Sequence, residues 1–398
     1  MIIIRLLLAF QLQSGGMEYF LNEYKLACPC IFGLESLVAD ELTLLGYTDI
    51  TSTNGRVVFK GDEASIARAN INLRCAERVL IQLAEFEAGS FEELFQGVKA
   101  IEWENYVGRD DAFPVKGWSL NSKLHSVPDC QAIIKKAVVE RLKAKHHIDW
   151  FKETGVKMQI QFSILKDVVS VFLDTSGEGL HKRGYRANAN EAPLKETLAA
   201  AMVKLARPFT DKPFYDPMCG SGTILIEAAM YMKKLAPGLN RSFAAESWGC
   251  IDKKLWNAAR SEALSRIDYT PFEVQGFDID EHAVALTLEN AKKAGVGANV
   301  KAMVQDIKNF SPKNSRGVIV CNPPYGERLL EVKEAEELYN IMGQVFTKLK
   351  GFHFFIISPS EKFEAIFGKR ADKKRKLYNG MIKCNLFQYF KGNKPQEK

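Results

Sequence analysis

This 398-residue sequence has none of the cysteine or histidine patterns that usually identify a metal site or a disulfide framework. No two cysteines form a Cys-x-x-Cys pair, and the six histidines form no metal-ligand pattern. The cysteines are Cys28, Cys30, Cys75, Cys130, Cys219, Cys250, Cys321 and Cys384. We therefore expect reduced thiols, no metal and a cytoplasmic protein.

Long apolar runs are also missing. The most apolar stretch, residues 1–10, is too short to span a bilayer and lacks a small-residue cleavage site after its apolar core. We therefore expect no membrane association, and we interpret residues 1–16, which precede Met17, as an upstream mis-start or a dispensable extension.

The length of the chain predicts two or three domains. Residues 26–173 mix strand-like and helix-like segments, and residues 175–192 form a polar, glycine-rich connector. Strands and helices then alternate, as in a parallel doubly wound sheet. The expected strands of that sheet are 213–216, 273–278, 300–305, 317–321 and 352–357. Two final strand-like runs flank Asn379-Gly380, which predicts an antiparallel hairpin.

A glycine-rich turn follows the first of these strands. The segment Asp216–Thr223 contains Gly220 and Gly222 and leads into an apolar helix. Glycines let the backbone approach a ligand closely, and a helix N-terminus offers free N–H groups. Gly-x-Gly alone is weak because any strand-to-helix turn could use it, and the third glycine of a dinucleotide site is missing. The Asp-Pro-x-Cys-Gly-Ser-Gly form instead suits the amino-acid end of S-adenosylmethionine.

Acidic side chains end the next two strands. Asp278 can accept hydrogen bonds from both ribose hydroxyls of a nucleoside. Asp306 could accept the adenine amino group or cap a helix, and the sequence leaves both interpretations open. The candidate donor-binding residues are Asp216, Pro217, Cys219, Gly220, Gly222, Thr223, Asp278, Asp280 and Asp306.

The most specific motif is Asn322-Pro323-Pro324-Tyr325, which follows an apolar strand directly. The two prolines fix φ and remove two backbone donors, so the turn is rigid. The side-chain oxygen of Asn322 and the carbonyl of Pro323 can accept both hydrogens of a base amine and point its lone pair at an activated methyl group. Tyr325 can stack on a base turned out of its helix. These four residues are the candidate catalytic set.

Basic residues gather in three places, which is typical of a phosphate-binding surface, although solvated helix faces and strand edges would look the same. One group lies between residues 116 and 147, one between 181 and 186, and one between 369 and 376. The candidate RNA-binding residues are Lys116, Lys123, Lys135, Lys136, His181, Lys182, Arg183, Arg186, Lys373, Lys374 and Arg375.

Three segments together resemble the methyltransferase domain of the RlmL type of 23S ribosomal RNA guanine-N2 methyltransferases. They are Asp216–Thr223, Gly276–Asp280 and Asn322–Arg328. Phe113–Lys116 and Asn121–Pro128 resemble a THUMP domain, which is an RNA-binding module. The resemblance covers nearly the whole chain from about residue 24.

The resemblance implies an α/β protein whose C-terminal domain has the Rossmann-like class I methyltransferase fold, preceded by an α+β ferredoxin-like and THUMP region. The implied divisions are 1–16 extension, 17–65 ferredoxin-like, 66–175 THUMP, 176–192 linker and 193–398 methyltransferase. It also implies S-adenosylmethionine as cofactor and 23S rRNA as partner, and we expect no protein partner. Some relatives carry a second methyltransferase domain, which this sequence does not support.

Several functions remain in competition. The leading one is guanine-N2 methylation of 23S rRNA. THUMP domains also serve tRNA enzymes, so tRNA guanine-N2 methylation is an alternative. The Asn-Pro-Pro-Tyr motif also permits adenine-N6 methylation of DNA, although no target-recognition domain for duplex DNA is recognisable. A non-catalytic RNA-binding assembly factor is a fourth hypothesis, against which the intact motifs argue.

Overall fold

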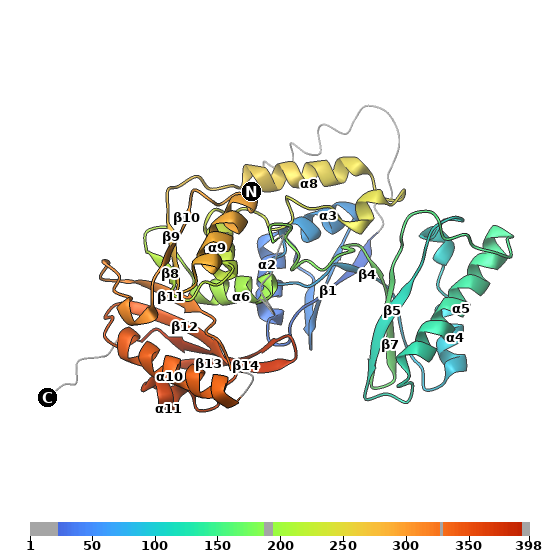
Figure 1. Cartoon of the computed structure of the whole chain (residues 1–398). Helices are drawn as coiled ribbons and strands as arrows, with labels where there is room; N and C mark the ends of the chain where they lie inside the picture. The colour runs from blue at the N-terminus through green and yellow to red at the C-terminus, as the bar shows by residue number, and fades with distance from the viewer. Residues whose placement is uncertain (1–22, 187–193, 327–328, 392–398) are drawn as a thin grey trace.

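The structure is a computed structural model that describes residues 23–186, 194–326 and 329–391. Over these residues the chain forms two seven-stranded sheets. Figure 1 shows them as separate lobes, with the C-terminal half of the chain at one end and helices α4 and α5 at the other. The expected extension at 1–16, residue Pro193 and the motif end Glu327–Arg328 lie outside the described residues. The expected α/β class is confirmed.

The first sheet has the strand order β2-β3-β1-β4-β7-β6-β5, so β4 joins its two halves. β4 pairs antiparallel with β1 through Leu80 and Ile81 and with β7 along its whole length. The strands are β1 Tyr24–Pro29, β2 Ile50–Thr53, β3 Arg56–Gly61, β4 Leu80–Glu87, β5 Val115–Leu120, β6 Ile160–Leu165 and β7 Val168–Asp174.

Helices cover this sheet in two pairs (Figure 1). α2 (Glu35–Leu44) and α3 (Glu63–Asn72) lie over the half that contains β1, and α4 (Phe91–Lys99) and α5 (Val127–His146) over the half that contains β5. The N-termini of α3 and α4 are closed by capping boxes, which satisfy free backbone N–H groups.

The second sheet has the order β10-β9-β8-β11-β12-β14-β13. β8 to β12 run parallel, and the β13–β14 hairpin closes one edge. The strands are β8 Phe214–Asp216, β9 Val274–Asp278, β10 Val300–Val304, β11 Gly317–Cys321, β12 Phe352–Ser358, β13 Lys373–Asn379 and β14 Ile382–Tyr389.

Side chains of β11 alternate between two apolar layers. Val318 and Val320 pack with α6 (Glu196–Ala206), α7 (Thr223–Met232) and α9 (Glu281–Lys293), whereas Ile319 and Cys321 pack with α10 (Leu329–Phe346) and α11 (Phe363–Phe367). Burial on both faces explains why this strand is uniformly apolar. The sheet is therefore doubly wound, as the alternation of strands and helices predicts.

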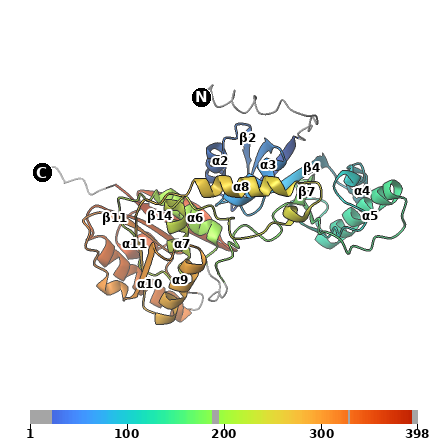
Figure 2. The same ribbon diagram turned by 90° about the horizontal axis from the view of Figure 1, so that it is seen from above.

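A helix in the insertion between α7 and β9 packs against the first lobe. This helix, α8 (Lys253–Ser265), lies along α3 (Figure 2), and Arg68 Nε donates to Glu262 Oε2 at 2.8 Å. The 3-10 turn Ala244–Ser247 precedes it. None of the helices in the described ranges is long and apolar enough to cross a membrane.

Candidate active site

A cavity of about 520 Å³ opens at the carboxyl edge of the second sheet. Its wall contains the residues that follow β8, β9, β10 and β11, together with one face of α10. Ligands of open α/β sheets bind at this edge. The lining residues among the candidates are Pro217, Gly220, Asp278, Asp306, Asn322 and Pro324.

The glycine turn after β8 has the backbone geometry that only glycine adopts easily. Gly220 has φ +52° and Gly222, the residue before α7, has φ +83°. A Cβ on Gly222 would lie 2.8 Å from the side chain of Thr287, whereas a Cβ on Gly220 would meet nothing within 4 Å. The turn is therefore packed against α9 on one side and open towards the cavity on the other.

Asp278 ties the tip of β9 to this turn. Its Oδ2 accepts a hydrogen bond from the backbone N–H of Gly220 at 2.8 Å, and its Oδ1 accepts one from Asp280 N at 3.1 Å. The carboxylate is only half-buried and lines the cavity. It can therefore receive the ribose hydroxyls of a bound nucleoside, as the sequence predicts.

Two of the other candidate acids cap helices. Asp306 Oδ1 accepts from Lys308 N at 2.8 Å, so the capping interpretation holds, and Asp306 also lines the cavity. Asp280 is exposed, does not line the cavity and caps α9 through His282 N. We conclude that Asp280 stabilises the helix rather than contacting a ligand in the cavity.

Asp216 lies behind the cavity wall, with only 1% of its surface exposed. Its Oδ1 accepts from Met218 N at 3.2 Å. Burial raises the pKa of Asp216 well above its ordinary value, against the lowering effect of that hydrogen bond. The remaining candidates Cys219, Gly222 and Thr223 are also buried beside the turn and do not line the cavity. These four residues thus shape the turn from behind, and their contact with a bound donor stays a prediction.

The cavity suits a nucleoside that carries positive charge. Glu334 and Glu337 on α10 line it together with Asp278 and Asp306, so four carboxylates and one cation, Lys308, surround one space. S-adenosylmethionine has a sulfonium, an ammonium, an adenine amine and two ribose hydroxyls to match the carboxylates. Its own carboxylate can lie at the N–H groups of the first turn of α7. The described residues contain no cluster that could hold a metal ion.

The Asn-Pro-Pro-Tyr turn forms the far side of the cavity. Asn322 and Pro324 line it, and the carbonyl of Pro324 accepts a hydrogen bond from the Tyr339 hydroxyl at 3.1 Å. Tyr325 donates its hydroxyl to Asn322 Oδ1 at 2.6 Å, and Asn379 Nδ2 donates to that hydroxyl at 3.3 Å. Burial also raises the pKa of Tyr325, so the hydroxyl keeps its proton. The Tyr325 hydroxyl therefore shares the Asn322 oxygen that is predicted to accept the target amine, a contact that sequence reasoning missed.

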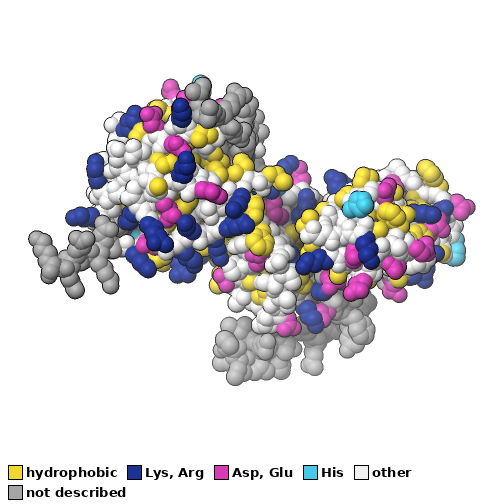
Figure 3. All heavy atoms as spheres, turned by 90° about the horizontal axis from the view of Figure 1, so that it is seen from below, with side chains coloured by type: hydrophobic (Ala, Val, Ile, Leu, Met, Phe, Trp, Pro, Cys, Tyr) yellow, Lys and Arg dark blue, Asp and Glu magenta, His cyan; other side chains and the backbone are white. Residues whose placement is uncertain are grey.

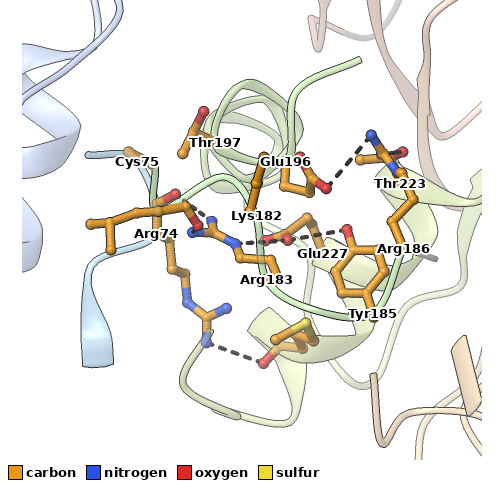
Figure 4. A network of polar contacts seen from close by, with 12 residues as sticks. Arg74, Cys75, Lys182, Arg183, Tyr185, Arg186, Glu196, Thr197, Thr223 and Glu227 are labelled. Atoms are coloured by element: carbon orange, nitrogen blue, oxygen red, sulfur yellow. Dashed lines mark hydrogen bonds and ion pairs between the residues drawn. The ribbon is translucent and has the colours of Figure 1, made fainter. Parts of the chain in front are cut away.

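Arg183 corrects one prediction on the basic residues. It is 3% exposed, and its guanidinium donates to Glu227 Oε1 at 3.3 Å, Leu180 O at 2.6 Å and Arg74 O at 2.5 Å. Figure 4 shows Arg183 and Tyr185 converging on Glu227 of α7. With all its groups turned inward, Arg183 cannot contact RNA phosphates in this structure.

Arg186 and His181 are also engaged within the fold. Arg186 donates to Thr223 Oγ1 and to Leu194 O and forms an ion pair with Glu196 (Figure 4). His181 lies 3.4 Å from Glu77. The predicted role at the RNA backbone is therefore corrected: Arg186 holds the linker against α7 and α6, and His181 lies beside Glu77 of the segment that precedes β4, whereas Lys182 is exposed.

The basic residues of the first lobe differ in exposure. Lys135 Nζ donates to Phe113 O at 3.1 Å and to Glu153 Oε1 at 2.6 Å, so it acts within the fold and the RNA prediction for it is corrected. Lys116, Lys123 and Lys136 are exposed. Figure 3 shows Lys and Arg side chains on both lobes of the face seen from below.

Lys116 borders a groove of about 630 Å³ that sequence reasoning missed. Trp118 and Lys157 line the same groove, and Trp118 keeps 48% of its surface exposed. The sequence contains a signal for this groove, because Lys116 and Trp118 are two residues apart in β5 and therefore lie on the same face of the strand. Cations beside an exposed aromatic ring fit a nucleic-acid strand.

The third basic group lies on β13. Lys373 and Lys374 are exposed, although Lys374 pairs with Glu364 at 2.8 Å. Arg375 Nη2 donates to Ser36 Oγ at 3.2 Å, so it joins the hairpin to the first lobe. The exposed lysines remain available to RNA, whereas Arg375 already has a structural partner.

Comparison with known proteins agrees with this geometry. The family model described as the RMKL-like methyltransferase domain matches residues 183–388. The models for the RlmL ferredoxin-like domain and the THUMP domain match residues 25–80 and 88–174.

Full-length relatives match as well. YpsC of Bacillus subtilis, a proposed RNA methyltransferase, is 46% identical over 381 residues, which is 95% of this chain and 99% of that protein. The structure of a proposed methylase from Clostridium difficile is 47% identical with a TM-score of 0.90, covering 95% of this chain and 100% of that one. SMU.472, a proposed methyltransferase in complex with S-adenosylhomocysteine, is 44% identical with a TM-score of 0.87, covering 94% and 99%.

Proposed function

Since the chain belongs to the RMKL-like methyltransferase family and carries RlmL ferredoxin-like and THUMP domains, we propose that it methylates the N2 amine of a guanine in 23S rRNA. The protein is an S-adenosylmethionine-dependent RNA methyltransferase with a THUMP domain. What we propose beyond this activity is the base (guanine), the atom (N2), the RNA (23S rRNA) and the cytoplasm as the location of the reaction. The position of Asn322 on the same cavity as Asp278 and the glycine turn supports methylation of a base amine, and the match to the RlmL ferredoxin-like and THUMP domains favours guanine in 23S rRNA.

The residues of the cavity divide into two sets. Asp278, Asp306 and the turn at Gly220 would hold the donor. S-adenosylmethionine, when bound, supplies a methyl group activated by the positive charge of its sulfur. The Asn322 side-chain oxygen and the Pro323 carbonyl accept the two hydrogens of the target amine, which orients its lone pair. Such positioning and charge alignment can supply most of the catalysis.

Tyr325 takes part in the opening of this pocket. Its hydroxyl now uses the Asn322 oxygen that the target amine needs. When the amine replaces that hydroxyl, the ring is free to stack on the extruded base. Stacking contributes about 1–3 kcal/mol per base, which offsets part of the cost of extrusion.

For RNA binding, we propose that residues 66–175 hold the substrate and residues 193–398 carry the chemistry. The exposed lysines Lys116, Lys123 and Lys136 support this division, and Lys182, Lys373 and Lys374 would extend the RNA contact over the linker and the catalytic domain. The groove beside Trp118 offers a place for an unpaired strand in the first lobe.

The test uses labelled S-adenosylmethionine with rRNA, tRNA and DNA from a strain that lacks the gene, followed by nucleoside mass spectrometry. We expect labelled N2-methylguanosine in 23S rRNA. Label confined to tRNA, or found in methyladenine of DNA, would overturn the proposal in favour of the matching alternative.

A variant connects the label to the cavity. We expect Asn322→Ala to lower methyl transfer by about 100- to 1000-fold, the usual loss when one positioned hydrogen-bonding group is removed, while donor binding by calorimetry is unchanged. Asn340→Ala, at an exposed position on α10, is the matched control and should retain full activity. Normal rates in Asn322→Ala would exclude the proposed role.

A further inference from the structure

The β13–β14 hairpin extends past the catalytic edge of the second sheet. β12 ends at Ser358, which pairs with Asn385 of β14. The hairpin continues beyond that pair to the turn Gly380-Met381, a distance of about 13 Å at 3.3 Å per residue. β11, which leads into Asn322, is the next strand after β12. The tip of the hairpin therefore overhangs the edge at which the target base must enter.

The tip is connected to the target pocket by two consecutive hydrogen bonds. Asn379 Nδ2 donates to the Tyr325 hydroxyl, and that hydroxyl donates to Asn322 Oδ1. Asn379 is the last residue of β13, two positions before Met381. Met381 is thus two residues along the hairpin from a side chain that is hydrogen-bonded to the target pocket, although nothing in the sequence motif itself involves it.

Met381 is unusually exposed for an apolar side chain, with 97% of its surface accessible. Single exposed apolar residues are common and need no explanation by themselves. Here the surroundings are those of a nucleic-acid surface. Residues 373–390 contain five basic residues and no acidic one, and Lys373, Lys376 and Lys383 are exposed.

The hairpin is also rigid. β13 and β14 pair without interruption from Lys373–Gln388 to Asn379–Ile382, and β14 pairs with β12. On the other side, Arg375 donates to Ser36 Oγ of the first lobe at 3.2 Å. A projecting apolar residue on a rigid basic hairpin matches the wedges that other proteins insert between base steps.

We propose that Met381 is a wedge that enters the RNA base stack beside the target guanine and fills the space this base leaves when it turns into the cavity. The lysines of the hairpin hold the flanking phosphates. The inference rests on the proposed function and narrows its substrate class to a guanine that is paired or stacked within an RNA helix. Met381 is a positioning residue, since it acts on the neighbours of the target and not on the reacting atoms.

The test compares two RNA duplexes that contain the methylated guanine, located in 23S rRNA by mass spectrometry of nuclease fragments. One is fully paired, and the other has an abasic nucleotide opposite the target, so that no base pair has to be broken. Single-turnover methylation is measured with the full chain, with Met381→Ser and with Leu264→Ser. Leu264, exposed on α8, is the matched control for loss of an exposed apolar side chain.

We expect Met381→Ser to slow methylation of the paired duplex by about 10- to 100-fold and that of the abasic duplex by less than about 3-fold. Leu264→Ser should match the wild type on both. Equal rates for Met381→Ser and wild type on the paired duplex, or equal losses on both duplexes, would overturn the wedge. Absence of labelled N2-methylguanosine from 23S rRNA would instead overturn the proposed function itself, and the wedge with it.

Discussion

Replacing Arg183 by methionine tests the assignment of this residue to the interior. The side chains of Arg183 and Glu227 are 2% and 0% exposed. Arg183→Met would leave the Glu227 carboxylate buried with the Tyr185 hydroxyl at 3.4 Å, and would remove the donor to the Arg74 carbonyl. Breaking a buried ion pair from one side costs about 3–5 kcal/mol.

The size of the effect makes it easy to measure by thermal unfolding. One kcal/mol shifts Tm by about 2–4 °C in a domain of about 150–250 residues, so Arg183→Met should lower the Tm of the catalytic domain by about 6–20 °C. Adding Glu227→Gln removes the unpaired charge and should recover a large part of that loss. Lys182→Met is the matched control, because this neighbouring lysine is 59% exposed and should leave Tm unchanged.

If Arg183 instead contacted RNA phosphates, Arg183→Met would give the opposite result, and that result would refute the assignment of Arg183 to the interior. A residue on the phosphate surface would weaken binding, reduce its salt dependence and leave Tm unchanged. If Arg183→Met behaves in that way, with a Tm within about 1 °C of the wild type, the buried ion pair does not have the assigned role.

Two further predictions concern the glycine turn and the linker. Gly222→Ala places a methyl group 2.8 Å from Thr287 at φ +83°, whereas Gly368→Ala, the control, has φ +76° and open space around the new methyl group. We therefore expect a lower Tm and weaker donor binding in Gly222→Ala than in Gly368→Ala. Equal losses of both variants in calorimetry and thermal unfolding would contradict this. Burial alone would raise the pKa of Glu77, but hydrogen bonds from His181 and Thr197 lower it to about 2. Because the folded pKa lies below the ordinary value of 4.5, the contribution of Glu77 is complete above that pH and is lost as pH falls towards 2. The Tm difference between wild type and Glu77→Gln should therefore shrink over that range, and a constant difference would refute it.

Local patterns in the sequence predict much of the catalytic lobe. Strand–helix alternation gives the parallel sheet, and glycine spacing gives the turn before α7. Asn379-Gly380 correctly predicts a hairpin, but the two-residue turn is Gly380-Met381, with positive φ at Gly380. The Asn-Gly pattern therefore predicts that a turn is present, whereas the register of the hairpin depends on how β14 pairs with β12.

Side-chain partners that are distant in sequence could not be predicted in this way. Arg183 reads as a surface residue in a polar connector, and only the position of Glu227 on α7 makes it a buried one. Tyr325 likewise reads as a stacking ring, although Asn379, 54 residues away, holds its hydroxyl beside Asn322. Both cases depend on which elements pack together, which local periodicity does not determine.

The central strand β4 fixes the spacing between the two ends of the molecule. It belongs to one continuous ladder with β1 on one side and β7 on the other, so the RNA-binding end of the first sheet cannot swing away without breaking that ladder. The α3–α8 contact and the buried linker fasten the same sheet to the catalytic lobe. The molecule therefore holds its THUMP domain and its catalytic cavity at one fixed spacing.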